Sequence, residues 1–355
     1  MPSAFRLGSR SIALIVSFAS LVIVGGLAFW IPVPYVTMSP GPTFDTLGKV
    51  GDSEMFTFGD DVETFPTDGR LDFTSVSVTR AETSVTMLTA LEAWWDKDTI
   101  VVPRDFIYPD EQTNDVADQQ GAVQLSRSQD ASRVAALRAV GMTVPESVVV
   151  DDVVAKAPAD GVLKKDDVIL AVDGEKVTNV QTAANAIADR QPGDDVVLSI
   201  VRKGKPRDVP ISTTENPDDP KRARVGINVG TKFDFPIEIE NHIGDRVGGP
   251  SAGLMFALGM YDQLTPGSLT GGTNIAGTGS ISPSGEVGTV GGIAQKMAGA
   301  EDAGASVFLV PADNCGEAIT ARDFNMTVVK VTKLDDAISS LEALKKNPKA
   351  KVPSC

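Results

Sequence analysis

The longest apolar stretch of the chain lies near its N-terminus, where residues 11–31 contain no charged side chain. About 20 apolar residues are enough to cross a bilayer as a helix. Arg6 and Arg10 precede this stretch, so the positive-inside rule predicts a cytoplasmic N-terminus and places the rest of the chain outside. Trp30 and Tyr35 would lie at the outer interface. We expect a single-pass anchor in the lipid bilayer, which we favour over a cleaved signal peptide.

The region that follows the anchor, residues 32–140, has uneven patterns. Alternation of apolar and polar residues predicts a strand at 71–78. Residues 83–95 have helical periodicity, and we expect their apolar face to belong to the core. That face consists of Val85, Leu88, Leu91, Trp94 and Trp95. Residues 105–124 are polar and show no pattern, and a helix is predicted from Ser128 or Asp130 to Val140.

Short strands dominate the middle of the chain. Apolar runs at 148–154, 168–172 and 196–201 predict strands, and 182–189 predicts a helix between the last two. Asp-Gly, Pro-Gly and Lys-Gly pairs mark the turns. We therefore predict a small β-rich domain over residues 141–213.

Strands and helices alternate in the C-terminal part, which predicts a compact α/β domain with a mixed sheet over residues 221–345 and a tail at 346–355. The fold class is thus α/β (α+β). Strands are predicted at 224–229, 235–239, 274–281, 307–310 and 327–331, and helices at 251–263, 295–303, 314–321 and 335–343.

Composition narrows the chemistry. The net charge of −15 argues against nucleic acid as a partner. No GxxxxGK[ST] loop occurs, so nothing suggests ATP as a driving ligand. Cys315 and Cys355 lack metal-ligand spacing, and we expect neither a metal nor another cofactor. Outside the cytoplasm the two cysteines would form a disulfide, although two free thiols remain the alternative.

Ser251 is the first candidate catalytic residue. It follows Gly249 and Pro250 and precedes an apolar run, so its hydroxyl would be accessible at a bend before a helix. Its main-chain N–H could then stabilise an oxyanion. The ordinary alternative is that Ser251 only caps the helix.

Lys296 is the second candidate. It lies near the start of a predicted helix, where the helix dipole disfavours a positive charge. A positive environment and burial would both favour the neutral amine, which could deprotonate a serine. Taken alone, Lys296 could equally be a solvated surface residue. A triad of His242 with Asp245 or Asp262 has no motif to support it.

Two segments, 157–163 and 166–174, together with the closing 196–204, resemble a bacterial PDZ domain in order and turn positions. The resemblance implies that an extended peptide adds to a sheet edge. The loop that would hold a peptide carboxylate is predicted at Gly141, Met142, Thr143 and Val144. A PDZ fold that packs against its neighbour and binds nothing is the alternative.

Gly-Pro-Ser-Ala-Gly at 249–253 and Gly-Gly-Ile-Ala-Gln-Lys at 291–296, with Ala-Gly-Thr-Gly at 276–279 between them, resemble the proteolytic domain of Lon-type endopeptidases. The resemblance implies that Ser251 is the nucleophile and Lys296 the base. It also implies that Thr278 hydrogen-bonds to the lysine and that Gly249 and Pro250 shape the nucleophile turn. The chain departs from the family in lacking an ATPase module and in having Gly249 where an acidic residue is usual.

Anchor, PDZ domain and protease domain together resemble the membrane-bound, PDZ-containing branch of that family. This implies an ATP-independent serine endopeptidase that cleaves extracytoplasmic unfolded or flexible polypeptides, with a hexameric ring as the expected assembly. Residues 32–140 would either complete the protease fold or form a separate module. A proteolytically silent, membrane-anchored PDZ scaffold is the alternative function.

Overall fold

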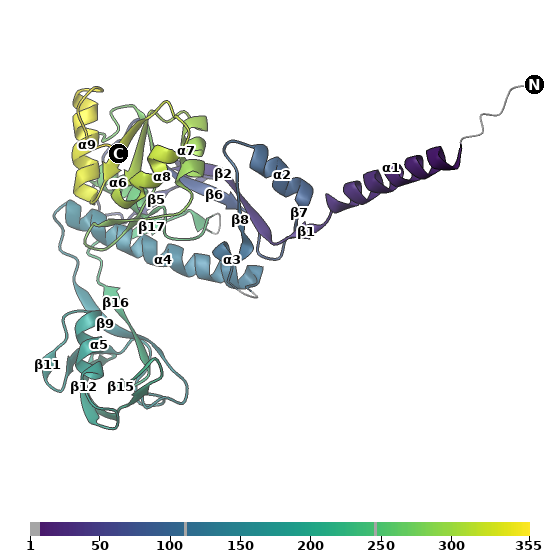
Figure 1. Cartoon of the computed structure of the whole chain (residues 1–355). Coiled ribbons are helices and arrows are strands. Elements are labelled where there is room, and N and C mark those ends of the chain that lie inside the picture. Colours follow the sequence, from purple (N-terminus) through teal and green to yellow (C-terminus); the bar gives the residue numbers. More distant parts are fainter. Residues whose placement is uncertain (1–7, 110–111, 245–246) are drawn as a thin grey trace, which may run out of the picture. The chain divides into compact units, whose positions relative to one another are not determined.

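The computed structural model describes residues 8–109, 112–244 and 247–355, and it divides into two compact units (Figure 1). The first unit combines Met1–Gly141 with Ile237–Cys355, and the second is Met142–Pro236. Arg6, with most of the predicted cytoplasmic segment 1–10, lies outside the described residues. Asp245, one of the two carboxylates considered for a triad, also lies outside them.

A six-stranded mixed sheet forms the centre of the first unit, in the order β22-β21-β18-β6-β2-β8. β18 runs parallel to β6 and β21, and β21 runs parallel to β22, whereas β2 is antiparallel to both β6 and β8. Segments before and after the second unit therefore share one sheet. The strands are β2 (Tyr35–Asp45), β6 (Arg70–Val78), β8 (Ile100–Pro103), β18 (Asn274–Gly277), β21 (Val307–Pro311) and β22 (Thr327–Val331).

Four short antiparallel pairs and several helices complete the first unit. The pairs are β1 (Pro32–Val33) with β7 (Val85–Thr86), β3 (Lys49–Val50) with β4 (Ser53–Glu54), β5 (Phe56–Phe58) with β17 (Ile239–Asn241), and β19 (Ser280–Ile281) with β20 (Val287–Gly288). The helices are α2 (Met87–Trp95), α3 (Arg104–Ile107), α4 (Asn114–Ala139), α6 (Gly253–Leu264), α7 (Ile293–Asp302), the 3₁₀ turn η2 (Ala312–Asn314), α8 (Cys315–Thr320) and α9 (Leu334–Lys346).

The core of the first unit lies between this sheet and the apolar helix α6. Phe73 of β6 stacks on Phe44 of β2 and meets Phe256 of α6 edge-on, with ring centroids 5.1 and 5.2 Å apart. Both geometries are those that aromatic pairs prefer. The nucleophile candidate thus precedes a helix that is fixed deep in the core.

The helix α4 is longer than the sequence predicted, because it starts at Asn114 rather than near Ser128. The Thr113 side chain caps it by accepting a hydrogen bond from the Val116 N–H. Its buried face includes small and hydroxyl-bearing residues, which give a weak hydrophobic periodicity. That is why the polar stretch 105–124 carried no signal for a helix.

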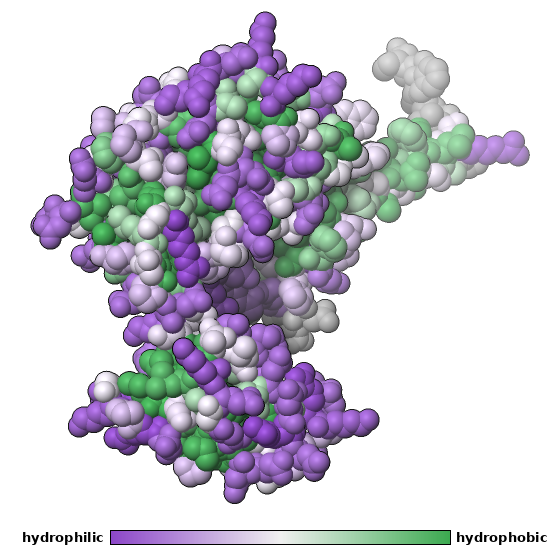
Figure 2. Space-filling view, turned by 90° about the vertical axis from the view of Figure 1, so that its left-hand side faces the viewer, coloured by the Kyte–Doolittle hydropathy of each residue, from purple (hydrophilic) through white to green (hydrophobic). Residues whose placement is uncertain are grey.

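The apolar N-terminal segment forms α1 (Ser9–Ala28), close to the predicted 11–31. The span Arg10–Ala28 is long and apolar enough to cross a membrane by length and composition. Its side chains are exposed rather than packed in a core. Figure 2 shows the resulting contrast between the hydrophobic surface of α1 and the mixed surface of the remaining chain.

The helix α2 differs from the prediction for residues 83–95. Trp94 and Trp95 are 72 % and 86 % exposed, so the assignment of this pair to the core was wrong. The small residues Ala90 and Ala93 are the more buried positions of the helix. Because the inward face is made of alanines, the bulky apolar face points outward.

The second unit is an antiparallel sheet in the order β13-β12-β10-β9-β16, covered by α5. Its core includes Val150, Ile169, Leu198 and Ile200. The unit extends past the predicted boundary at 213, because the strand expected to open the C-terminal domain pairs with β9 instead. Its elements are β9 (Glu146–Val153), β10 (Val168–Val172), β11 (Glu175–Lys176), α5 (Val180–Ala188), β12 (Asp195–Arg202), β13 (Lys205–Ser212), β14 (Thr214–Asn216), β15 (Asp219–Arg224) and β16 (Ile227–Phe233).

Candidate active site

Ser251 lies in a turn two residues before the first residue of α6. Gly249 has a φ of +85°, a left-handed conformation that favours glycine. The Gly253 N–H donates to the Pro250 carbonyl over 3.3 Å and closes the turn. Gly249 and Pro250 therefore shape the backbone that presents the Ser251 side chain.

The helix α4 holds this turn from the outside. The Ser128 hydroxyl donates to the Pro250 carbonyl over 3.0 Å, and the Ser132 hydroxyl donates to the Gly253 carbonyl over 2.9 Å. A Cβ atom on Gly253 would come within 2.8 Å of Ser128 Oγ, closer than such atoms approach. The glycine after Ala252 is thus required by the close approach of α4, a helix that the sequence had shown only in part.

Thr278 and Ser251 are brought together at the end of β18. The Thr278 hydroxyl donates to the Ser251 main-chain carbonyl over 3.1 Å, and the Gly279 N–H donates to the same oxygen over 2.9 Å. The Leu254 N–H then donates to the Gly279 carbonyl over 3.0 Å. The threonine was expected to bond to the lysine, whereas the bond seen here fixes the backbone of the nucleophile turn.

Lys296 lies in the second turn of α7 and is only 2 % exposed. Burial lowers the pKa of its amine to about 8. The carboxylate of Glu317 opposes this shift, because its negative charge raises the pKa. Ile293 and Met297 of α7 belong to one core cluster with Ala276 of β18. The helix that carries Lys296 therefore packs on the strand whose end holds the Ser251 turn, and the solvated alternative for this lysine does not apply.

Two polar residues that the sequence did not single out fix the start of α7. Glu317 of α8 accepts a hydrogen bond from the Ile293 N–H over 2.8 Å. Asn314 forms two hydrogen bonds with the main chain of Val290, 3.0 and 2.9 Å long. A carboxylate at a helix N-terminus is favoured by the dipole. No local sequence pattern could have indicated Glu317 and Asn314, because both residues lie about 20 positions after the lysine.

The glycine before α7 is also conformationally required. Gly292 has a φ of +71°, and a Cβ atom there would come within 2.8 Å of Val76 Cγ1.

The predicted disulfide is present: Cys315 and Cys355 are bonded with an S–S distance of 2.10 Å. It joins the end of the chain to the first residue of α8, next to Asn314 and close to Glu317.

His242 belongs to a different environment. Its ring contacts the Thr57 hydroxyl over 2.9 Å and the Glu240 carboxylate over 3.8 Å. Asp262 is fully buried on α6 and accepts a hydrogen bond from the Leu269 N–H. Burial raises the Asp262 pKa to about 6. The contacts of His242 and Asp262 are thus accounted for elsewhere, which leaves no basis for a triad of these two residues.

A groove of about 770 Å³ runs along α4 beside the nucleophile turn. Gly121 and Gly248 approach each other closely in its lining, and the Gly249 N–H donates to the Gly121 carbonyl over 2.9 Å. Its lining includes Arg80, Asp118, Leu125, Gln129 and Val247.

The second unit has a pocket of about 340 Å³ between α5 and β16. Gly226 and Ile227 lie at its β16 side, and Ala184 and Asn185 lie on α5. The predicted carboxylate loop, Gly141–Val144, is not part of this lining. The segment Arg224-Val225-Gly226-Ile227 lines the pocket. Its glycine lies between two apolar residues, and no binding role was predicted for it from the sequence.

Comparison with known proteins agrees with this arrangement. A model of the Lon protease (S16) C-terminal proteolytic domain matches residues 239–343, and a PDZ domain model matches residues 119–213. The PDZ match begins within α4, although α4 belongs to the first unit.

Curated relatives match over short segments. A probable periplasmic serine endoprotease, DegP-like, of Chlamydia trachomatis is 41 % identical over 71 residues, which are 20 % of this chain and 14 % of that protein. A protein of the same description from Halomonas elongata is 36 % identical over 85 residues, 23 % of this chain and 18 % of that protein. The chain thus spans less than a fifth of the length of these relatives.

Among solved structures, the PDZ domain of an SdrC-like protein from Listeria monocytogenes is 25 % identical and covers 23 % of this chain and 86 % of that one. Its TM-score of 0.22 is too low to add to the assignment. The two family matches show that the chain carries a segment similar to a PDZ domain and a segment similar to the Lon-type (S16) proteolytic domain.

Proposed function

We propose that this protein is an ATP-independent serine endopeptidase that uses a Ser251–Lys296 dyad. The observation that carries the proposal is the burial of Lys296, whose pKa falls to about 8 in a helix that packs on the strand beside the nucleophile turn. Burial of a charged amine costs stability and favours its neutral form. As a general base it would be useful close to neutral pH.

In the proposed reaction the neutral Lys296 amine accepts the proton of the Ser251 hydroxyl, and Ser251 Oγ attacks the peptide carbonyl carbon. The main-chain N–H groups of Ser251 and Ala252, which precede α6, would hold the oxyanion. The Lys296 ammonium then gives its proton to the leaving amine as the C–N bond breaks. A water molecule, deprotonated by Lys296, hydrolyses the acyl-enzyme and regenerates both groups.

Polypeptides are the substrates that the two domains favour, because one domain cleaves peptide bonds and the other recognises extended peptides. We propose that the groove along α4 receives the segment to be cleaved. The pocket between α5 and β16 would recruit a second part of the same chain or gate access to the dyad. Unfolded or flexible polypeptides are the substrates that need no unfolding motor.

Anchoring is proposed from α1 and its flanks. The helix would cross the cell membrane once, with the N-terminus in the cytoplasm and both domains outside. The DegP-like relatives are described as periplasmic, which supports an extracytoplasmic location. The disulfide between Cys315 and Cys355 is consistent with an oxidising compartment.

The test is casein degradation by the full chain in detergent micelles, measured for Ser251→Ala, Lys296→Met and the control Lys351→Met, which removes an exposed lysine of the tail. We expect both dyad variants to lose activity by at least about 10³-fold and the control to retain it. Labelling by a serine-reactive probe should vanish in Ser251→Ala. Full casein degradation by Lys296→Met would contradict the dyad. A wild-type protein that the probe labels but that degrades no casein would favour the silent scaffold.

A further inference from the structure

The largest unexplained feature of the first unit is the outward apolar face of α2. Met87, Leu88, Leu91, Trp94 and Trp95 follow helical periodicity and are all exposed, from 38 % at Leu88 to 86 % at Trp95. A helix of a globular protein normally turns such a face to the core. Contiguous apolar surface of this kind marks a site of interaction.

Hydrogen bonds fix this face to the end of the apolar helix α1. The Leu88 N–H donates to the Phe29 carbonyl and the Met87 N–H to the Ile31 carbonyl, each over 3.0 Å. The strands β1 and β7 pair directly beside these bonds, Pro32 with Thr86 and Val33 with Val85. The first turn of α2 is therefore bonded to the residues that leave α1 (Figure 1).

Other exposed apolar residues gather at the same segment. The Arg104 N–H donates to the Pro34 carbonyl over 3.0 Å, and two residues later Phe106 is 81 % exposed. β8 pairs with the start of β2, Tyr35 opposite Pro103. Trp30 itself is 71 % exposed. Three separate stretches of chain thus place large apolar side chains around the exit of α1.

We propose that α2 lies on the lipid–water interface of the bilayer that α1 crosses, with Trp94, Trp95 and Phe106 inserted at headgroup level. This inference rests on the proposed anchoring by α1. Tryptophan is enriched at membrane interfaces because its ring is amphipathic. A second protein copy is the less suited occupant, because the face is continuous with the residues that enter the membrane.

The dimensions set the orientation of α2. Trp94 and Trp95 lie about 11 Å along the helix axis from Met87. The interfacial region is about 5–8 Å thick on each side of the hydrocarbon core. Both ends of α2 reach this layer only when the helix is inclined to the membrane plane by less than about 45°.

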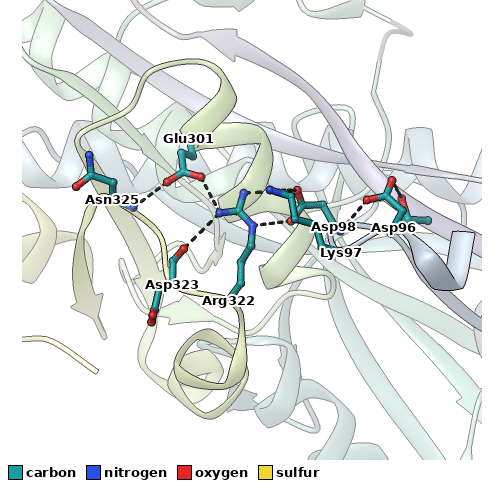
Figure 3. Close-up of polar contacts among 8 residues, drawn as sticks. Asp96, Lys97, Asp98, Glu301, Arg322, Asp323 and Asn325 are labelled. Carbon is teal, nitrogen blue, oxygen red and sulfur yellow. Dashed lines mark hydrogen bonds and ion pairs between the residues drawn. The ribbon is translucent and has the colours of Figure 1, made fainter.

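The loop after α2 transmits this position to the protease domain (Figure 3). The Arg322 guanidinium donates to Asp98 in that loop over 2.7 Å and to Glu301 of α7 over 2.8 Å. Glu301 lies on the helix that carries Lys296, five residues later. A docked α2 would thus hold the lysine helix at a fixed height above the bilayer.

The chain contains three tryptophans, which permits a direct test. The full chain is reconstituted into phosphatidylcholine vesicles with or without bromine on the upper acyl carbons. Trp30→Phe leaves Trp94 and Trp95 as the only tryptophans, and Trp94→Phe with Trp95→Phe leaves Trp30. We expect a loss of fluorescence in brominated vesicles for both proteins.

The outcomes separate the two proposals. Quenching of Trp30 without quenching of Trp94 and Trp95 overturns the interfacial docking of α2 and leaves the anchor in place. Acrylamide then tells whether the pair faces water or is covered by a second copy, and either result contradicts the inference. Absence of quenching in both proteins means that α1 itself fails to insert, so that the anchoring proposal falls as well.

Discussion

The helices α7 and α2 break the same rule in opposite directions. α7 buries a lysine, which is 2 % exposed, whereas α2 exposes two tryptophans at 72 % and 86 %. Charged side chains are normally outside and large aromatic ones mostly inside. Burial of the lysine costs stability in the isolated protein, whereas exposure of the tryptophans leaves apolar surface in contact with water.

The cost in α7 is electrostatic and depends on pH, because only the charged amine resists burial. The exposure of the apolar face of α2 does not depend on pH, and a membrane can cover this face. A buried amine whose charge depends on protonation suits acid–base chemistry. An apolar face that is favourable only in a nonaqueous environment suits docking. The comparison therefore separates a candidate general base from a candidate docking surface, although both are first noticed as side chains in an unusual environment.

Replacement of Lys296 by methionine should have the largest effect. The folded pKa of about 8 lies below the unfolded value of 10.5, so the unfolded state binds more protons between these values. Stability therefore rises with pH from about 8 to 10.5, and the cost is fully present below pH 8. At about 1.4 kcal/mol per unit, Lys296→Met should increase the free energy of unfolding at pH 7 by about 3 kcal/mol, measured by denaturant titration.

The same variant should be inactive, so a gain in stability accompanies a loss of function. The stability gain should shrink when the titration is repeated at pH 9.5, because the wild-type amine is then largely neutral. An unchanged gain at both values would mean that packing, and not charge, sets the cost of burying this lysine.

Removal of the Arg322 guanidinium tests the connection between the two helices. Arg322 also stacks on the Phe324 ring, with its central carbon 4.2 Å from the ring centroid. Arg322→Gln would leave Asp98 and Glu301 without a shared cation, and we expect the Tm to fall by about 2–4 °C. Arg322→Lys keeps the positive charge but loses the bidentate geometry of the guanidinium group. Its Tm should therefore lie between those of Arg322→Gln and the wild type. A Tm equal to that of the wild type would show that the contacts of Arg322 with Asp98 and Glu301 do not stabilise the connection between the two helices.

The sequence indicated the two turns of the candidate site more clearly than the residues that support them. The motifs at 249–253 and 291–296 singled out both residues of the proposed dyad, because close backbone turns demand glycine and proline at fixed positions. The supporting residues Ser128, Ser132 and Glu317 carry no local signal. They matter only because distant segments meet, which periodicity along the chain does not report.

The error at α2 has a related cause. Helical periodicity in residues 83–95 correctly indicated a helix with one apolar face, but it cannot tell what that face contacts. The same applies to the strand predicted at 224–229, which overlaps the end of β15 and the start of β16 and was assigned to the wrong unit. Local patterns predict elements, and only the tertiary hydrogen bonds show their partners.

Replacement of Glu317 by glutamine should move the pH dependence of catalysis. The carboxylate raises the Lys296 pKa, so its removal lowers that pKa further below 8. The rise of kcat/KM with pH, which reports the free-enzyme pKa, should shift to lower pH by less than about one unit. Glutamine retains an oxygen for the Ile293 N–H and thus keeps the cap of α7. A shift to higher pH would contradict the assignment of Lys296 as the base.

The smallest effect on stability should come from the most exposed aromatic side chain. Trp95→Gln removes a ring that is 86 % exposed and that packs little against the folded chain. Exposed substitutions usually stay within about 0.5 kcal/mol, so the free energy of unfolding of the two units, followed in a detergent-solubilised full chain, should be almost unchanged. Phe256→Ala, a matched change of a fully buried ring on α6, should instead cost about 3–5 kcal/mol. If Trp95→Gln destabilised the protein to a similar extent, the ring would be part of a core in solution, and the contrast between α2 and α7 would disappear.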